Sequence, residues 1–568
     1  MTLPPRADGD ARALASQLSI SVTAAVVLVR RGHVDKERIE RFFDPRLAHL
    51  TPPASMRDRA EAVDRIARAV KTSERVCVFG DYDADGITSA AVMTDVLTTL
   101  GGSVVTLLAD RFSGGYGLSD DALDRILATG ATLLVTCDCG SSDHERLARA
   151  RSRGVDVVVI DHHRVPPEPL PVLAFLNPHR PECGFPYKGL ASVGLALSIG
   201  AGVRASLGRE LDMRNWLDLV AIGTIGDVAP LDGDNRALVR AGLALLALGK
   251  RPGTRALAEV CGYTGAAPLT GEDVAFRFAP RINAPGRLAK PDLALALLLS
   301  KSDTEARALA AELDQLSQRR KEIDRALLVE ANAMLADPAL AALPVVVLGK
   351  EGWHQGVVGI VAGRLASQTG KPTIIIGFDG ATGRGSVRGP AGFHLYDALA
   401  KSKEALLGFG GHQAAAGVHV AASQLERLRE LFASACTDLG ASSSAQPSPL
   451  AADAVLEAGD EPALVLRDMD RFEPCGHTNP APTLALESVR VREAREVRGG
   501  HLKLALEVGN TTLSCFGFEL GARAASLRSG TRVHAIGRLR HDTYRGGGAV
   551  EMRLLGVESD IEPAPRTE

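Results

Sequence analysis

The chain has 568 residues, more than one hydrophobic core usually organises, and domains of roughly 50 to 250 residues predict three or four of them. Apolar residues make up 45% of the sequence and charged residues 23%, and no run of eighteen apolar residues occurs, which argues against a membrane protein. The net charge of -3 gives no global sign of a nucleic-acid partner, although it is compatible with a local basic groove. The N-terminus has no basic segment followed by an apolar one, so we expect no secretory signal and a cytoplasmic protein.

The eight cysteines are scattered along the chain, and two of them lie inside apolar, strand-like runs. This distribution argues against a disulfide framework. Cys137 and Cys139 form a C-x-C pair, but no second pair stands at zinc-finger spacing. The pattern therefore does not favour a structural zinc site.

Between about residues 76 and 230, short apolar strands alternate with helical stretches: VCVFG, then 88–100; SVVTLLA, then 119–129; ATLLVTC, then 142–152; and VDVVVID. This order predicts an α/β fold with a mainly parallel sheet. Ligand sites in such sheets lie beyond the carboxyl ends of the strands. We therefore look for chemistry where these strands end.

A segment without glycine or proline follows over 303–336, with apolar residues at helical spacing, and predicts one long helix that joins two domains. A second α/β unit follows, with VVVLG at 345, a glycine-rich helix start over 352–363 and TIIIG at 373. The Ser/Pro/Ala stretch over 441–453 is typical of a linker. Alternating runs beyond it, such as LKLALEV and RVHAIGRLR, predict a small antiparallel barrel of the OB type.

Three aspartates crowd the end of the first strand, in GDYDADG: Asp81, Asp83 and Asp85. Like charges at this spacing repel and raise one another's pKa unless a cation lies between them, so a divalent metal is the usual explanation. An aspartate-rich turn that caps the following helix explains the same pattern. Taken alone, the cluster leaves both explanations open.

Other element ends also carry potential metal ligands. Asp138 follows the strand LLVTC, the trio Asp161, His162 and His163 follows VVVI, and Asp227 follows an apolar run that favours helix over strand. A helix cap, a core histidine or a turn aspartate explains each of these residues singly. Together they supply the ligands for two divalent cations about 3.5 to 4 Å apart, as in phosphoester hydrolases. Carboxylate-rich sites favour Mg²⁺ or Mn²⁺ over zinc.

The order GDYDADG, DCG, DHH and GDVAPL resembles that of the DHH phosphoesterases. Further motifs narrow the resemblance to the RecJ single-stranded-DNA exonucleases: RFSGGYGL at 111–118, PRINAPGR at 280–287, GWHQGVVGIVAGRL at 352–365, GRGS at 383–386 and GFGGHQAAAG at 408–417. The likeness covers nearly the whole chain. It departs in RFEPCGHTNPAP, where these proteins usually have a more glycine-rich run, which weakens the assignment of the barrel behind it.

The resemblance implies an organisation into six parts. These are an N-terminal lead-in over 1–60, a DHH phosphoesterase domain over 61–300, a connecting helix over 301–340, a smaller α/β DHH-associated substrate-binding domain over 341–440, a linker over 441–454 and an OB-like nucleic-acid-binding barrel over 455–560.

The resemblance also implies residue roles at the metal site. The expected ligands of two Mn²⁺ or Mg²⁺ ions are Asp83, Asp85, Asp138, His162 and Asp227, with Asp138 bridging the two ions. His163 would face the scissile phosphate. Asp81 would orient ligands, and Asp161 would fix an imidazole tautomer from behind the ligands.

A second group of residues is expected to hold the strand. Arg111 and Tyr116 would form part of a pocket for a terminal 5′ phosphate. Closely spaced glycines in GGHQAAAG would let backbone N–H groups approach phosphates. The expected substrate-binding residues on the two lobes are Arg281, Asn283 and Arg287 on one, and Arg384, Ser386, Gly410, Gly411 and His412 on the other.

The function implied by the resemblance is metal-dependent hydrolysis of single-stranded DNA from the 5′ end, in repair and recombination. A helicase and a single-strand-binding protein are partners that it suggests. Two alternatives stay open: a hydrolase of short oligonucleotides or cyclic dinucleotides, and a catalytically silent single-stranded-DNA-binding scaffold with a degenerate centre. A long helix and an extra barrel favour a polymer substrate over the first, and retention of every expected ligand argues against the second.

Overall fold

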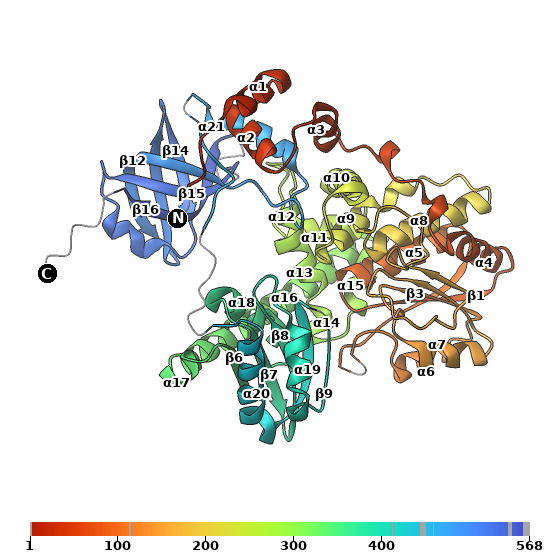
Figure 1. Ribbon diagram of the computed structural model, residues 1–568. Coiled ribbons are helices and arrows are strands. Elements are labelled where there is room, and N and C mark those ends of the chain that lie inside the picture. Colours follow the sequence, from red (N-terminus) through yellow and green to blue (C-terminus); the bar gives the residue numbers. More distant parts are fainter. Residues whose placement is uncertain are drawn as a thin grey trace. The chain divides into compact units, whose positions relative to one another are not determined.

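The computed structural model describes residues 3–112, 115–411, 413–442, 450–457, 459–542 and 548–560. The chain divides into two compact units (Figure 1). The first contains residues 1–283, 291–310 and 449–568, and the second contains 284–290 and 311–448. Each unit is described by itself below.

A parallel sheet organises the first unit. Its strands are β1 (Arg75–Gly80), β2 (Ser103–Leu108), β3 (Leu133–Cys137), β4 (Asp156–Ile160) and β5 (Ala174–Leu176), in the order β2-β1-β3-β4-β5. Helices α5 (Ala84–Thr99) and α8 (Ser192–Ser206) cover one face, and α6 (Asp120–Ala128) and α7 (His144–Ser152) cover the other (Figure 1). The central strands are buried on both faces, which explains why they read as continuous apolar runs. The predicted parallel sheet is confirmed.

Further helices complete this part of the unit. They are α4 (Arg59–Lys71), α9 (Leu217–Gly226), α10 (Gly233–Leu248), α11 (Pro252–Val260), α12 (Gly271–Asp273), α13 (Ala279–Ile282) and α15 (Asp292–Leu299). Helix α9 approaches α5 closely at Gly223, where a Cβ atom would lie only 2.2 Å from the Thr88 hydroxyl oxygen. Because Asp227 caps the C-terminus of α9, this contact brings that carboxylate toward the residues of α5.

The C-terminal strands of the first unit close into a barrel. They are β11 (Ala454–Val455), β12 (Leu484–Val497), β13 (His501–Val508), β14 (Thr511–Gly517), β15 (Arg532–His541) and β16 (Val550–Ser559), and α21 (Pro462–Met469) lies between β11 and β12. Strand β12 pairs with both β13 and β15, so the ladder returns to its start. The predicted OB-like barrel is confirmed, and the 441–453 linker lies largely outside the described residues.

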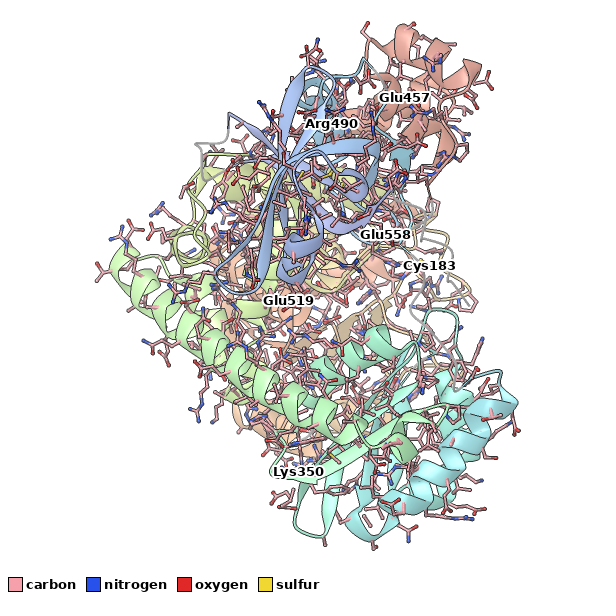
Figure 2. All side chains as sticks on the ribbon, turned by 90° about the vertical axis from the view of Figure 1, so that its left-hand side faces the viewer. Cys183, Lys350, Glu457, Arg490, Glu519 and Glu558 are labelled. Atoms are coloured by element: carbon pink, nitrogen blue, oxygen red, sulfur yellow. The ribbon has the colours of Figure 1, made fainter. Side chains whose placement is uncertain are left out.

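The N-terminal helices α1 (Gly9–Leu18), α2 (Val22–Arg30) and α3 (Lys36–Phe43) share a hydrophobic core with the barrel. Helix α2, VTAAVVLVR, is apolar almost all round and must be covered on several sides. It packs against α21, and the buried Glu457 accepts a hydrogen bond of 2.9 Å from the Ala7 amide (Figure 2). The expected lead-in is therefore part of the barrel's packing.

No single helix in the described part of the chain is both long enough and apolar enough to cross a membrane. Only α1 and α2 taken together pass on length and composition, and a bend of 115° separates them.

The glycine-free segment forms the predicted long helix α16 (Asp303–Leu335), and the larger part of the second unit begins within this helix. Its sheet has the order β6-β7-β8-β10-β9, with strands β6 (Val346–Glu351), β7 (Thr373–Asp379), β8 (Thr382–Arg388), β9 (Gly408–Gly411) and β10 (Ala415–Ala421). Helices α19 (Leu395–Lys401) and α20 (Leu425–Asp438) share one core with this sheet, and α16 and α18 (Val358–Thr369) share another. Short helices α14 (Pro285–Leu288) and α17 (Pro338–Ala341) complete the unit. Lys350, near the end of β6, pairs with Glu330 of α16 at 2.8 Å (Figure 2).

Candidate metal centre

Strand register brings the polar residues after β1, β3 and β4 side by side. Gly80 pairs with Cys137, and Cys137 pairs with Ile160. The residues that follow continue this ladder, because the Asp81 amide donates to Cys137 O and the Asp138 amide donates to Ile160 O. Asp138 then leaves the strand in the left-handed region, with φ 65°. The expected site at the carboxyl edge of the sheet therefore forms from residues distant in sequence.

Helix ends complete the cluster. Asp83 caps α5 by accepting from the Asp85 and Gly86 amides at 3.1 and 3.2 Å. The helix-cap explanation is therefore correct for Asp83, and one carboxylate oxygen accepts both hydrogen bonds. Asp85 lies in the first turn of α5, and Asp227 follows α9.

His162 lies at the middle of these carboxylates. Its Nε2 atom is 3.2 Å from Asp138 Oδ1, 3.7 Å from Asp227 Oδ2 and 3.8 Å from Asp85 Oδ2. Three overlapping groups have ligand atoms within 4.8 Å of one another: Asp85, His162 and Asp227; Asp138, His162 and His163; and Asp81, Asp83 and Asp138. Asp138 and His162 each belong to two of these groups. Each of them is therefore placed to be a ligand that two neighbouring cations share.

The electrostatics of this cluster fit divalent cations. Burial and the neighbouring Asp83 raise the pKa of Asp85 to about 7, and burial and Asp85 raise the pKa of Asp227 to about 9. Burial, then Asp85, also raises the pKa of Asp138 well above its usual range. His162 has the opposite shift, to a pKa of about 4, mainly through burial. Its buried Nε2 makes no hydrogen bond with the described residues. Carboxylates short of counter-charge around a neutral imidazole are the donor set that Mn²⁺ and Mg²⁺ accept.

Asp161 organises the histidine pair from beneath. Its carboxylate accepts from the His162 and His163 amides at 2.8 and 3.1 Å, from His163 Nδ1 at 2.8 Å and from the Ser141 amide at 3.0 Å. Burial acts to raise the pKa of Asp161, but these donors and the imidazole charges outweigh it, and its pKa falls below the usual value. On His163, burial lowers the pKa, yet Asp161 raises it to about 9.

Tyr116 touches the same histidine through its hydroxyl group. The Tyr116 oxygen lies 2.9 Å from His163 Nδ1 and donates to Asp138 O at 3.0 Å. We expected Tyr116 to form part of the pocket for a terminal 5′ phosphate. Its hydroxyl contacts place it within the hydrogen bonds that hold His163.

Sequence reasoning missed the residues that orient Asp85 and Asp138. The Ser192 and Val193 amides, at the start of α8, donate to the Asp85 carboxylate at 2.7 and 2.9 Å. The Ser192 hydroxyl also donates to Asp138 Oδ1 at 3.2 Å. The helix N-terminus thereby stabilises a buried carboxylate. The signal available in the sequence was only a serine before an apolar helical run.

Asn177 is a second missed residue. It is buried, and its amide nitrogen donates to His163 O at 2.8 Å and to the Ser141 hydroxyl at 3.4 Å. Its carbonyl oxygen accepts from the His179 amide at 2.9 Å. Asn177 therefore ties the loop after β5 to the loop that carries the histidines.

The expected substrate-binding residues of the first unit differ in their contacts and their burial. The Arg111 guanidinium lies over the Tyr82 ring, 4.2 Å from its centroid. Arg281 is buried and donates to Arg277 O at 2.7 Å and Val260 O at 3.2 Å. The Asn283 Oδ1 atom is buried without a hydrogen bond from the described residues.

The remaining expected substrate residues belong to the second unit. Arg287, which we expected on the opposite lobe from Arg384, lies in the same unit and donates to Gly356 O at 3.1 Å. Arg384 and Ser386 lie two positions apart on β8, and Gly410 and Gly411 are on β9. His412 lies outside the described residues.

Arg388 lies on the same face of β8 as Arg384 and Ser386, because residues two positions apart on a strand share a face. A Cβ atom at Gly359 of α18 would lie 3.0 Å from the Ser386 hydroxyl oxygen and 3.4 Å from the Arg388 guanidinium. The absence of a side chain at Gly359 lets the first turn of α18 approach both residues.

A parallel sheet with aspartates and a D-H-H triplet at its carboxyl edge defines the class of the DHH phosphoesterases. The family model for the DHH N-terminal domain matches residues 75–224, the DHHA1 domain model matches 341–438, and the RecJ OB domain model matches 452–555. The last match includes the RFEPCGHTNPAP segment that departs from the expected pattern.

Comparison with individual relatives identifies one family within this class. The chain is 34% identical to the single-stranded-DNA-specific exonuclease RecJ of Bacillus subtilis over 532 residues, 93% of this chain and 67% of that protein. It is 37% identical to the RecJ of Escherichia coli over 88% of this chain and 89% of that one. The crystal structure of Thermus thermophilus RecJ superposes with a TM-score of 0.81 at 30% identity, over 98% of this chain and 78% of that chain. The chain belongs to the RecJ family.

Proposed function

We propose that this protein is a metal-dependent exonuclease that hydrolyses single-stranded DNA in the 5′ to 3′ direction. The observation that carries the proposal is the convergence of the Asp85, Asp138 and Asp227 carboxylates, from α5 and the ends of β3 and α9, around His162. The RecJ relatives named for activity on single-stranded DNA support the substrate. Crystal structures of Thermus thermophilus RecJ with Mn²⁺ and with Mg²⁺ support these two metals.

In this proposal the residues that hold the cations are Asp83, Asp85, Asp138, His162 and Asp227. When bound, divalent cations activate water as a nucleophile and stabilise the leaving oxygen. The protein keeps the ligands in place through the Asp85 contacts to α8 and through the Ser192 hydroxyl on Asp138. Holding ligands before substrate arrives lowers the reorganisation needed in the transition state.

His163 is proposed to contact the phosphate. Asp161 and Tyr116 both lie against Nδ1 of this ring, so the described contacts leave Nε2 for a phosphoryl oxygen. Asp161 accepts four hydrogen bonds and is thereby fixed. The Oδ1 atom of Asp81 accepts a hydrogen bond from the Gly117 amide at 3.4 Å. Asp81 is proposed to orient the neighbouring ligands Asp83 and Asp138.

End-labelled single-stranded and duplex DNA, digested in Mg²⁺ and in Mn²⁺, tests activity, strand preference and direction together. We expect mononucleotides to be released from the 5′ end of single strands. Cleavage confined to di- or trinucleotides would favour the short-oligonucleotide hydrolase. Binding without cleavage by a metal-loaded protein would favour the silent scaffold.

Recognition of the 5′ end is proposed to use the guanidinium of Arg111, because a terminal phosphate carries more negative charge than a phosphodiester. The Arg111 stack on Tyr82 keeps it near Asp81. Arg281, Asn283, Arg287, Arg384, Ser386, Gly410, Gly411 and His412 are proposed to hold the strand. Arg111→Ala should reduce cleavage of 5′-phosphorylated strands more than of 5′-hydroxyl strands. An equal proportional loss on both would show that Arg111 does not read the terminus.

We place the enzyme in the cytoplasm, which its eight buried, unbridged thiols support. A helicase and a single-strand-binding protein are proposed partners, because a duplex must be opened before a single strand can be degraded. Affinity capture on immobilised protein, with nuclease added to remove bridging DNA, tests whether either associates directly.

A further inference from the structure

A pocket of about 890 Å³ adjoins the metal centre and has no role in the function proposed so far. It shares His162 with the centre and continues along the loop after β4 and the loop after β5. This volume is in the range of small-molecule sites. Its position means that a strand with its phosphate at the centre has an adjoining space within reach.

The cations of the pocket fall into two kinds. Arg180 pairs with Asp58 at 2.6 Å and with Glu182, and it also donates to Phe175 O, so its donors are occupied by the protein. Arg164, two residues after His162, is exposed and makes no ion pair or hydrogen bond with the described residues. Glu168 also lines the pocket and disfavours an anion near its carboxylate. Because Arg164 has no ion-pair partner among the described residues, it is the group to which a phosphate would bind.

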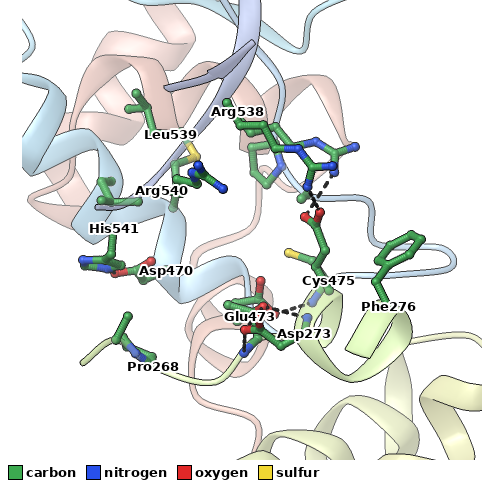
Figure 3. A pocket seen from close by; sticks show the side chains of 18 of the residues that line it. Pro268, Asp273, Phe276, Asp470, Glu473, Cys475, Arg538, Leu539, Arg540 and His541 are labelled. Carbon is green, nitrogen blue, oxygen red and sulfur yellow. Dashed lines mark hydrogen bonds and ion pairs between the residues drawn. The ribbon is translucent and has the colours of Figure 1, made fainter. Parts of the chain in front are cut away.

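A different pocket in the same unit provides a contrast. It lies between the segment 267–277 and the barrel, and its cations are matched by carboxylates (Figure 3). His541 lies 2.9 Å from Asp470, and Arg277 lies 2.9 Å from Asp273. That pocket has no unpaired arginine comparable to Arg164 in the described residues, and it gives no sign of an anionic ligand.

The walls beside Arg164 suit a nucleobase. Val165, Pro166 and Leu170 line the pocket, and the prolines have fixed φ and no backbone N–H. His179, which is exposed, also lines the pocket and contributes an imidazole ring. Its position is set by Asn177, which accepts from the His179 amide and donates to His163 O. A base between these surfaces would be held by its faces, with few donors to read its edges.

We propose that this pocket binds the nucleoside next to the scissile phosphodiester, with Arg164 on a neighbouring phosphate and the base between Pro166 and His179. The inference rests on the proposed function and names a subsite for its polymer substrate. Face contacts hold any base, so the subsite supports cleavage without sequence preference.

The test is a double-mutant cycle in which one change is made in the protein and the other in the DNA strand. Single strands carrying one abasic residue at the first, second or third position from the 5′ end are compared with the intact strand. The proteins are wild type, Arg164→Ala, His179→Ala and the control Arg151→Ala, which removes an exposed arginine of α7. Both kcat/KM with Mn²⁺ and affinity with EDTA are measured.

For the wild type we expect a loss of about tenfold at one abasic position, the effect typical of one stacked base. His179→Ala should lower the rate on the intact strand and shrink this abasic penalty to under about twofold. Arg164→Ala should weaken binding of every strand, and Arg151→Ala should match the wild type. The proposal is overturned if the abasic penalty in His179→Ala equals that of the wild type at all positions, or if Arg164→Ala behaves as Arg151→Ala.

The cleavage and affinity measurements distinguish failure of this inference from failure of the proposed function. If the wild type binds strands but cleaves none, the exonuclease proposal fails, while the affinity cycle still decides the pocket. If cleavage is normal and neither cycle shows coupling, the exonuclease proposal stands and the subsite fails. All of the substituted side chains are exposed, and equal melting temperatures would confirm that the variants fold.

Discussion

The metal centre and the pocket of Figure 3 are both rich in charge, yet they are built on opposite principles. In the pocket, cations lie against carboxylates: Arg538 pairs with Glu272 at 3.5 Å, and His541 with Asp470 at 2.9 Å. In the centre, Asp85 and Asp138 are buried among other carboxylates, and the imidazole at their middle has a pKa of about 4.

The charged groups of the pocket in Figure 3 stabilise the fold by pairing with one another, whereas those of the metal centre require a ligand. Paired groups satisfy one another and need no further partner. A buried group of like charges is destabilising unless something external compensates it, so its survival in a fold indicates that a ligand does so. Experiments on either cluster test this contrast.

The largest effect is expected at Asp138, whose oxygens belong to two of the three candidate ligand groups. Asp138→Ala should lower hydrolysis about a thousandfold or more, since in the proposed function both cations would share this ligand. Because φ at this position is 65°, alanine adds backbone strain, and Asp138→Asn is the matched variant that tolerates this conformation. Comparable turnover in either folded, metal-supplied variant would refute the two-metal assignment.

Metal removal should reveal the uncompensated carboxylates through the pH dependence of stability. The folded pKa of Asp85 is raised to about 7 and that of Asp227 to about 9, from 3.8. The folded, metal-free protein therefore holds more protons than the unfolded chain over about pH 4 to 9. Its free energy of unfolding should fall as pH rises through this window.

Melting curves in EDTA and in Mn²⁺, at pH values across that range, measure the effect. We expect the rise in melting temperature on adding Mn²⁺ to grow with pH, because the cations replace the protons that the carboxylates lose. A rise of the same size at every pH would contradict this account.

A smaller effect should distinguish two roles of Tyr116. Tyr116→Phe keeps the ring and removes the hydroxyl that contacts His163 Nδ1 and Asp138 O. If the hydroxyl positions the histidine, kcat should fall about ten- to a hundredfold with little change in KM. If the ring instead stacks on substrate, Tyr116→Phe should be near neutral and Tyr116→Ala should raise KM.

The sequence predicted that Asp138 and the Asp161–His163 triplet would lie near the aspartates after β1, because parallel strands carry their carboxyl ends to one edge of the sheet. It did not predict Ser192 or Asn177, because their contacts with Asp85 and His163 depend on where α8 and β5 dock. It also treated 1–60 as a separate lead-in. The Ala7 amide bonds Glu457 across 450 positions, and no local pattern contains such a pairing.

The smallest effect is expected in the pocket of Figure 3, at Glu272, which contacts both Arg538 and Arg553 of the barrel. These side chains are 34 to 37% exposed, and exposed pairs contribute at most about 1 kcal/mol to stability. Glu272→Gln should therefore shift the melting temperature by less than about 2 °C and leave kcat/KM on short strands unchanged. Thermal melting and cleavage assays in the same buffer measure both. A large loss of activity at preserved stability would mean that these paired charges act on the substrate, and the division between the two clusters would fail.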